Sequence, residues 1–306
     1  MQTPRSLIRE ITTPALRQSV HRLFGQSPAL RVGRELMGPE GLWKWAITVG
    51  PCVNAELAAM VPPIPPEEFR RINAAVEPET FLWRGLVDAE RFIDKYLAYR
   101  SGRHPPPARL LDFGCGCGRL ARFLAAQPER WDLHGCDVNS DLVGWCAHNL
   151  AGMTAFTNSR LPPLPNPDAS FDLVYSFSVF THMPEDASVL WIRELGRVLS
   201  PGGVLVITTI GPAAIDTLAG SEEVRANFGF TEDELVPLRH ALDSSGFVIR
   251  PYPSIAPSMG DVGDGYGLVF VSPERVKGWA AGLFDVVEHE EGTVNHWQDV
   301  VVMVRR

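Results

Sequence analysis

Three closely spaced glycines, at positions 114, 116 and 118, follow an apolar run in the segment LLDFGCGCGRL from Leu110 to Leu120. Glycine has no Cβ, so these residues let the backbone turn sharply and approach a bound molecule closely. A helix that begins directly after them would direct free N–H groups and a positive dipole end at a carboxylate or phosphate. The segment therefore predicts a buried strand, a ligand-binding turn and a helix, in that order.

An acidic residue, Asp137, follows the next predicted strand, which covers Asp132 to Cys136. In a doubly wound sheet, a carboxylate at this position accepts hydrogen bonds from the two hydroxyls of a ribose. Together with the glycine turn, it predicts a nucleoside pocket. A dinucleotide fingerprint, GxGxxG, would require glycine at position 119, where the chain has Arg119, and Asp112 stands two residues before the first glycine. This spacing argues against NAD, and an NAD-dependent oxidoreductase remains only as an alternative.

The elements that must position these residues follow a regular order. From Arg109 onward, short apolar runs alternate with helical stretches, which is typical of βαβ units and a mostly parallel sheet. Strands are expected at residues 109–113, 132–136, 153–157, 171–177 and 203–209, and helices at 118–127, 140–150 and 185–199. The proline-rich connection 158–170 is expected to be a loop. Residues 283–289 and 297–304 are expected to form a terminal strand pair.

Taken together, these segments resemble class I S-adenosylmethionine-dependent methyltransferases. LLDFGCGCGRL and Asp137 are similar to the first motif and the ribose-binding acid of that family. SFDLVYSFSVFTHM (170–183) resembles its fourth strand, and ELGRVLSPGGVLVITT (194–209) resembles its following helix, turn and fifth strand. The resemblance implies an α/β fold, a doubly wound, mostly parallel seven-stranded sheet with helices on both faces and an antiparallel last strand. It also implies S-adenosylmethionine as the cofactor.

The resemblance further implies which residues bind that cofactor. Those expected around its methionine and ribose portions are Asp112, Gly114, Cys115, Gly116 and Gly118, with Asp137 holding the ribose hydroxyls. Val138 is expected to pack beside the adenine, and Asn158 and Ser159 to face the adenine edge, although many relatives have Asp where Asn158 stands. Residues expected near the transferred methyl group, at the carboxyl end of strand four, are Ser176, Phe177 and Ser178.

Methyl transfer from a sulfonium is an in-line displacement, to which a protein contributes approach, alignment and exclusion of water. A hydroxyl or protonated amine acceptor must also lose a proton, whereas a thioether need not. His182, just beyond strand four, is the candidate catalytic base; the alternative is that it only fixes its loop by hydrogen bonding. A second alternative for the whole chain is a non-catalytic S-adenosylmethionine-binding partner subunit.

Composition excludes several classes of partner. The formal net charge of −8 is a poor match for nucleic acid, and strand four lacks the Asp/Asn-Pro-Pro-aromatic sequence that grips a planar nitrogen. No apolar run is long enough to span a membrane, and residues 1–10 lack the apolar core of a signal peptide, so a cytoplasmic location is expected. Cys115 and Cys117 are too close in a tight loop to chelate zinc together, and no metal is expected. A homodimer is left open.

The remaining segments are expected to enclose a small-molecule substrate. We divide the chain into an N-terminal helical arm (1–107), the cofactor-binding core (108–210), a lid insert (211–280) with one helix near 232–244, and a terminal strand pair (281–306). Candidate substrate contacts in the lid are Asp261, Asp264 and Tyr266, with a solvated acidic loop as the alternative. Aromatic residues that could close the other side are Trp43, Trp45, Phe81 and Trp83, unless they belong to the core.

Charge is unevenly distributed along the chain. Residues 211–300 contain fifteen acidic residues against four Arg and one Lys, a net charge of −10, whereas residues 1–34 carry a net charge of +5. If the acidic segment covers the active site, its charge favours an acceptor with an amino or cationic group. We therefore expect a methyl group to be moved to an oxygen, nitrogen or sulfur atom of a small molecule.

Overall fold

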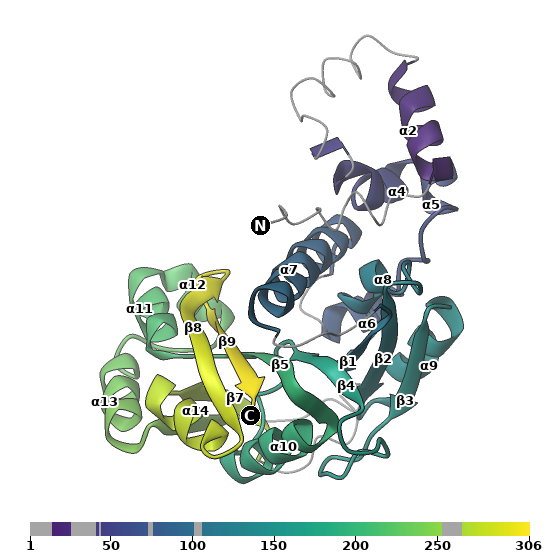
Figure 1. The fold of residues 1–306 in the computed structure, drawn as a ribbon. Helices are drawn as coiled ribbons and strands as arrows, with labels where there is room; N and C mark the ends of the chain where they lie inside the picture. The colour runs from purple at the N-terminus through teal and green to yellow at the C-terminus, as the bar shows by residue number, and fades with distance from the viewer. Residues whose placement is uncertain (1–13, 26–40, 43, 73–75, 101–105, 253–264) are drawn as a thin grey trace.

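The computed structural model describes residues 14–25, 41–42, 44–72, 76–100, 106–252 and 265–306. Its centre is a seven-stranded sheet in the order β3-β2-β1-β4-β5-β9-β8 (Figure 1). The strands are β1 (Ala108–Phe113), β2 (Trp131–Asp137), β3 (Met153–Thr157), β4 (Phe171–Ser176), β5 (Leu199–Thr209), β8 (Phe284–Val294) and β9 (Gln298–Arg305). The first five run parallel and β9 is antiparallel to both of its neighbours, which confirms the predicted fold class.

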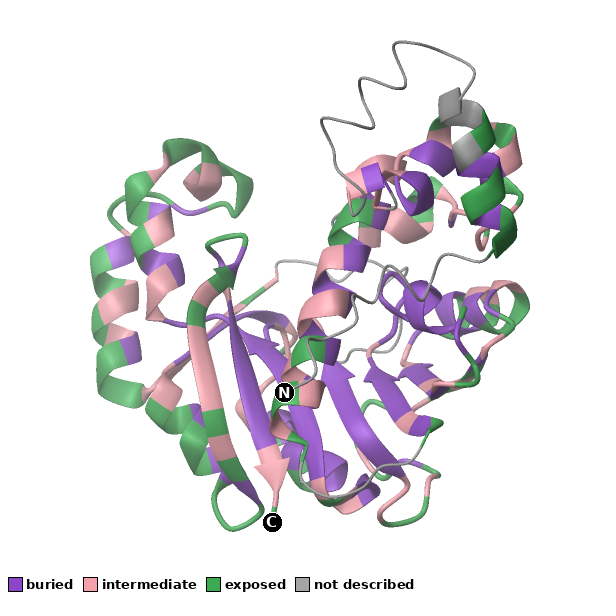
Figure 2. Ribbon diagram, turned by 45° about the horizontal axis from the view of Figure 1, so that its top comes forward, coloured by how far each residue is buried: buried purple, intermediate pink, exposed green. Residues whose placement is uncertain are grey.

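Helices cover both faces of this sheet. They are α7 (Pro78–Tyr99), α8 (Ala121–Leu124) and α9 (Ser140–Asn149) on one face, and α10 (Glu185–Val198) and α14 (Pro273–Ala280) on the other. Because successive side chains of a strand point to opposite faces, Leu110 packs with the first group of helices and Leu111 with the second. Figure 2 shows the central strands almost entirely buried, as expected for a parallel sheet covered on both sides, whereas the edge strands β3 and β8 are partly exposed.

The predicted bounds of two core elements were wrong. The helix after the glycine turn was expected at 118–127, but α8 covers only Ala121–Leu124. Gly118 has a φ of +77°, in the left-handed region, so a right-handed helix cannot include it. Pro128 disfavours helical backbone for the preceding residue and limits the other end. β5 begins at Leu199 rather than 203, because an irregular pairing between Phe171 and Leu173 of β4 accommodates the Pro-Gly-Gly turn.

The N-terminal part of the chain forms a separate group of helices joined to the sheet by α7. α2 (Pro14–Gly25), α4 (Gly50–Val53) and α5 (Ala55–Ala58) lie together away from the sheet in Figure 1, and α6 (Glu67–Ile72) lies nearer α8. α7 is amphipathic as its sequence predicts, and its buried residues join the core on one face of the sheet. Its Lys95 forms ion pairs with Glu288 and Glu290 of β8, at 2.9 and 2.6 Å.

Segment 211–280 has more regular structure than the sequence predicted. It contains α11 (Pro212–Gly220), α12 (Glu222–Asn227), α13 (Leu235–Ser245) and α14, together with a two-stranded antiparallel sheet of β6 (Phe247–Pro251) and β7 (Gly267–Val271). These helices are too short to show a clear apolar periodicity in the sequence, but two of them begin after a capping serine. The Ser221 and Ser272 side chains accept hydrogen bonds from backbone N–H groups three residues on. No helix in the described ranges is long and apolar enough to cross a membrane.

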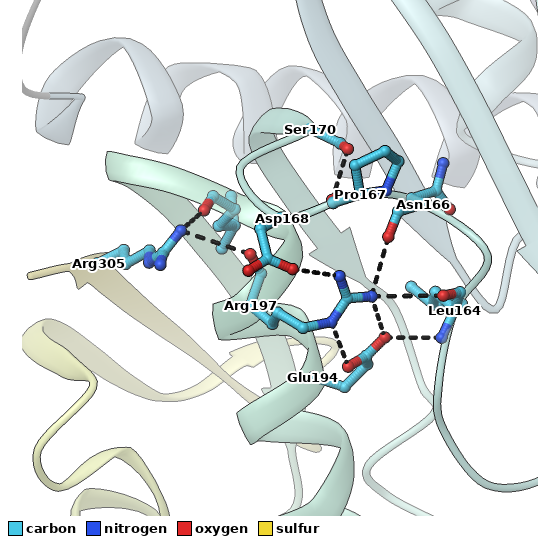
Figure 3. A network of polar contacts seen from close by, with 9 residues as sticks. Leu164, Asn166, Pro167, Asp168, Ser170, Glu194, Arg197 and Arg305 are labelled. Atoms are coloured by element: carbon cyan, nitrogen blue, oxygen red, sulfur yellow. Dashed lines mark hydrogen bonds and ion pairs between the residues drawn. The ribbon is translucent and has the colours of Figure 1, made fainter.

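The proline-rich connection between β3 and β4 is a loop, as predicted, and Arg197 of α10 holds it (Figure 3). The Arg197 guanidinium donates to both carboxylate oxygens of Glu194, to Asp168, and to the backbone carbonyls of Leu164 and Asn166. Glu194 in turn accepts a hydrogen bond from the Leu164 N–H at 2.6 Å. The arginine therefore fixes a segment that has no secondary structure of its own.

Replacing Arg197 with Met should lower the free energy of unfolding by about 2 to 3 kcal/mol, because buried carbonyls and the Glu194 carboxylate lose their donor. Arg197 lowers the pKa of Glu194, so this stabilisation is present above the ordinary Glu pKa and is lost as the pH falls below it. Urea denaturation at pH 7 and pH 4 measures both effects. Arg193→Met, at an exposed position of the same helix, is the control; equal effects of the two substitutions would contradict the assignment.

Candidate active site

A cavity of about 860 Å³ opens at the carboxyl ends of the parallel strands. The strand order reverses between β1 and β4, and such a switch point is where open α/β sheets bind ligands. Nine predicted site residues line this cavity: Gly114, Gly116, Asp137, Val138, Asn158, Phe177, Ser178, His182 and Tyr266. Its volume lies toward the upper end for ligand pockets, so it has room for a nucleoside and a second molecule.

Other predicted contacts do not line the cavity. Asp112, Cys115 and Ser176 are buried beneath it, Gly118 packs against Leu150, and Ser159 is exposed outside it. Trp83 lies on the outer side of α7 with 46% of its surface exposed, and Phe81 and Trp45 belong to the core or pack against it. Asp261, Asp264 and Trp43 lie outside the described residues.

The glycine turn is shaped to let a ligand approach the backbone. Gly114 has a φ of +79°, and a Cβ there would lie 2.2 Å from Val179 Cγ2, so a side chain does not fit. The Gly116 N–H donates to Asp137 Oδ2 at 2.9 Å, and the Asn139 N–H donates to Asp137 Oδ1 at 2.9 Å. Each carboxylate oxygen keeps a further lone pair. Asp137 can therefore accept two ribose hydroxyls while the backbone holds it in position.

Asn158 provides the polar contact expected at an adenine edge. Its Nδ2 donates to the Ser159 carbonyl at 2.8 Å, while its Oδ1 is buried and has no hydrogen-bond partner within the described structure. A buried acceptor without a partner costs free energy unless a ligand supplies a donor. An exocyclic amino group of a purine is such a donor. The Asn158 amide thus fits adenine even though many relatives have Asp at this position.

Asp112 lies under the turn and does not line the cavity. Burial raises its pKa to about 7, and the Tyr175 hydroxyl donates to its Oδ2 at 3.1 Å. β1 and β4 are neighbours, so this bond links the strand before the glycine turn to the strand before the proposed reaction centre. The contribution of Asp112 is therefore to support the floor of the cavity.

His182 lies where its sequence position predicted, in the loop after β4. Its Nδ1 is 3.2 Å from the Gly267 carbonyl and 3.0 Å from the Tyr252 hydroxyl. A carbonyl oxygen only accepts hydrogen bonds, so this contact favours a proton on Nδ1 and leaves Nε2 unprotonated. Burial lowers the pKa of His182 to about 4. The ring is consequently neutral near pH 7, and its unprotonated Nε2 lies 3.5 Å from Ser178 Oγ, which can donate to it.

The small β6–β7 sheet covers this histidine. The Gly267 N–H donates to the His182 carbonyl at 2.9 Å, and the Val269 N–H donates to the Thr181 carbonyl at 2.9 Å. Rings of Tyr252 and Tyr266 lie 5.9 and 5.3 Å from the imidazole, centroid to centroid. The insert predicted to act as a lid is thus joined by backbone hydrogen bonds to the loop that carries the candidate base.

A buried ion pair at the other side of the turn was not predicted from the sequence. Arg119 Nη1 lies 2.8 Å from Asp88 Oδ2 of α7, and both side chains are less than a tenth exposed. The Arg119 guanidinium also lies over the Phe177 ring, 4.3 Å from its centroid. In the sequence, Arg119 was visible only as the residue that breaks the dinucleotide fingerprint. In the structure, Arg119 connects α7 to the floor of the cavity.

The described acidic residues of segment 211–300 lie away from the lining of the cavity. Thirteen of its fifteen acidic residues are described, and none of them lines the cavity. The acids that do line it are Asp88, Asp137 and Asp186, of which Asp88 is paired with Arg119. The described acidic residues of this segment give no support to the predicted cationic or amino acceptor, which stays a prediction because Asp261 and Asp264 lie outside the described residues.

Comparison with known proteins agrees with this geometry. A family model described as a methyltransferase domain matches residues 110–203. A fatty-acid O-methyltransferase of Mycolicibacterium smegmatis is 36% identical over 106 residues, which are 34% of this chain and 38% of that protein. A protein of the same species described as a probable S-adenosylmethionine-dependent methyltransferase is 32% identical over 143 residues, 46% of this chain and 52% of that protein. The chain spans about half or less of the length of these curated relatives.

A solved structure shares the fold across most of the chain. Magnesium protoporphyrin IX methyltransferase from Synechocystis PCC 6803, with bound S-adenosylhomocysteine, has a TM-score of 0.50 and 14% identity, covering 78% of this chain and 93% of that one. Residues 110–203, which contain the glycine turn and its acid, match a methyltransferase domain, and the predicted resemblance to S-adenosylmethionine-dependent methyltransferases is confirmed.

Replacing Asp88 with Ala should lower the free energy of unfolding by about 3 to 5 kcal/mol, because Arg119 is left as a buried charge without its partner. The double variant Asp88→Ala/Arg119→Met, which removes both charges, should recover part of this loss. Chemical denaturation measures both, with Asp94→Ala at an exposed position of the same helix as the control. A double variant less stable than the single one would contradict the uncompensated-charge explanation.

Proposed function

We propose that this protein is an S-adenosylmethionine-dependent methyltransferase that acts on a small molecule. The observation that carries the proposal is a single cavity in which nucleoside contacts, Asp137 and Asn158, and an unprotonated base nitrogen, His182 Nε2, line the same space. The family match of residues 110–203 supports the donor. The size of the cavity supports an acceptor bound beside it.

Each of the residues that bind the donor has its own role in this proposal. Gly114 and Gly116 let the backbone approach the donor, Asp137 binds the ribose hydroxyls, and Asn158 accepts from the adenine. When bound, S-adenosylmethionine supplies a methyl group on a positively charged sulfur; its transfer to a nucleophile leaves S-adenosylhomocysteine and, from a hydroxyl acceptor, one proton. Val138 packs beside the adenine ring and excludes water.

His182 is proposed to take that proton. A base must be unprotonated to act, and burial keeps the imidazole neutral down to acidic pH. The Gly267 carbonyl fixes the ring and directs the free Nε2 toward Ser178. An acceptor hydroxyl, or an amine that loses a proton, makes use of this arrangement, whereas a thioether sulfur does not require it.

Calorimetric titration with S-adenosylhomocysteine and with NAD tests the cofactor. S-adenosylhomocysteine should bind, and Asp137→Ala should weaken its binding by about 1 to 3 kcal/mol through loss of charged hydrogen bonds. Asp132→Ala, at an exposed position of the same strand, is the matched control and should leave the affinity unchanged. Binding of NAD without S-adenosylhomocysteine would favour the oxidoreductase alternative, and no binding of either would overturn the proposal.

Histidine side-chain NMR tests the base. His182, identified by comparison with His182→Gln, should remain neutral with its proton on Nδ1 from pH 8 down to pH 5 and titrate near pH 4. Turnover of a hydroxyl acceptor should therefore persist through pH 5 and fall as the pH drops through about 4. His182→Gln should lower kcat about 10²- to 10⁴-fold without weakening S-adenosylhomocysteine binding.

The exposed His240 of α13 provides the control for that experiment, since His240→Gln should change neither kcat nor the binding of S-adenosylhomocysteine. An imidazole that titrates near pH 6.5, or unchanged turnover in His182→Gln, would remove His182 from the mechanism. Cofactor binding without turnover of any acceptor would instead favour the non-catalytic partner subunit.

A further inference from the structure

Besides the nucleoside contacts, the cavity is lined by residues from other elements. We call this second set the acceptor end; it consists of Ile210, Phe228, Tyr252, Tyr266, Trp297 and Gln298. Residues lining it come from the end of β5, from α11 and α12, from the β6–β7 sheet and from the β8–β9 turn. All the described residues that these elements contribute to the cavity are uncharged. The charged lining residues come instead from α7, the glycine turn, β2, the 158–170 connection and α10.

Flat aromatic rings dominate this end. Phe228 and Trp297 stack with their ring centroids 4.0 Å apart and their planes within 13°. Tyr252 and Tyr266 lie 5.9 Å apart on the β6–β7 side, next to His182. Aromatic rings pack favourably on one another beyond the area that they bury, whereas an ionised acceptor would lose its hydration without finding an opposite charge here. The lining therefore favours an uncharged acceptor with an aromatic ring.

Two polar atoms of the protein indicate which substituents the aromatic ring of the acceptor carries. Gln298 Nε2 donates to Ser178 Oγ at 3.1 Å, and its Oε1 is buried with no hydrogen-bond partner in the described part of the chain. His182 Nε2 lies 3.5 Å from the same Ser178 Oγ, whose single proton goes either to Nε2 or to Thr181 Oγ1 at 3.3 Å. When Ser178 donates to Thr181, both Gln298 Oε1 and His182 Nε2 can accept, so a ligand with two donors satisfies both. A carboxylate supplies none, and a single hydroxyl supplies one.

We propose that the acceptor end binds an uncharged aromatic diol, with one hydroxyl on His182 Nε2 and its neighbour on Gln298 Oε1. This inference rests on the proposed function and names its substrate class. Both contacts converge on Ser178 Oγ, so the two hydroxyls lie on neighbouring ring positions. Gln298 is the residue that selects a diol over a monohydroxylated ring, because losing the second donor leaves its amide oxygen unsatisfied.

The test uses the full chain saturated with S-adenosylhomocysteine and four probes on one naphthalene ring system: 2,3-dihydroxynaphthalene, 2-naphthol, 2-naphthoic acid and 2-(aminomethyl)naphthalene. Calorimetry should give an affinity for the diol about tenfold higher than for 2-naphthol, the value of one additional satisfied hydrogen bond. The carboxylate and the ammonium probe should bind more weakly than 2-naphthol. With S-adenosylmethionine, mass spectrometry should detect the monomethyl ether of the diol.

Substitution of Gln298 by Met keeps the length of the side chain and removes its amide. This variant should bind the diol and 2-naphthol equally, with its affinity for 2-naphthol changed by less than about twofold. Gln18→Met, at an exposed position of α2, is the control and should retain the diol preference.

Equal affinities of the unaltered protein for the diol and 2-naphthol would overturn the inference. So would tighter binding of the charged probes, or no binding of the naphthalene probes. If any of these outcomes occurs while S-adenosylhomocysteine still binds, the acceptor class is wrong and the methyltransferase proposal stands. Absence of S-adenosylhomocysteine binding would overturn both.

Discussion

The hydrogen bond from the Gly116 N–H to the Asp137 carboxylate links the two features on which the cofactor site depends. Parallel pairing of β1 and β2 brings their carboxyl ends together, so a turn that follows one strand meets an acid that ends the other. The positive φ angles of Gly114 and Gly116 shape the turn so that the Gly116 N–H points toward Asp137. The same contact therefore fixes the shape of the turn and the orientation of the carboxylate before a ligand arrives.

Elements distant in sequence then close around this centre, each through a few specific contacts. Asp88 of α7 reaches Arg119 beside the turn, and the backbone of β7 pairs with the loop that carries His182. Gln298, at the start of β9, reaches Ser178 after β4. Ser178 adopts a φ of 58°, and its N–H donates to Thr208 Oγ1 at 2.8 Å, so neighbouring strands hold an unfavourable backbone conformation. The cavity is thus assembled by tertiary contacts between the sheet and its covers.

The sequence was informative where local pattern and function coincide. Alternation of strands and helices predicted the sheet, and the motif order predicted that Gly114, Asp137, Phe177 and His182 would meet at one edge. Such residues follow directly after strands, and parallel strands bring those positions together without further information. Side-chain direction was not predictable in the same way. Asp112 lies next to the turn in sequence, yet it faces the buried Tyr175 hydroxyl rather than the ligand.

Contacts between the central residues of the site and the elements that close around them could not be predicted from the sequence, for a related reason. Pairing of Asp88 with Arg119, or of Gln298 with Ser178, joins residues 31 and 120 positions apart, and no periodicity encodes such pairs. A net charge summed over a segment likewise carries no information about which face its side chains occupy, so the sequence alone could not place the acidic residues of 211–300 relative to the cavity.

The β6–β7 sheet buries His182, and this burial has two consequences for the chemistry of the site that reinforce each other. Desolvation lowers the pKa of His182, which keeps the imidazole neutral, and under the proposed function the same desolvation disfavours an ionised acceptor that would need water or a counter-charge. A base with a low pKa is a weak one, so in this proposal it takes the proton of a hydroxyl only as that oxygen loses electron density in the transition state. The proposed selectivity for the acceptor and the protonation state of the base then have one structural origin, the cover formed by β6 and β7.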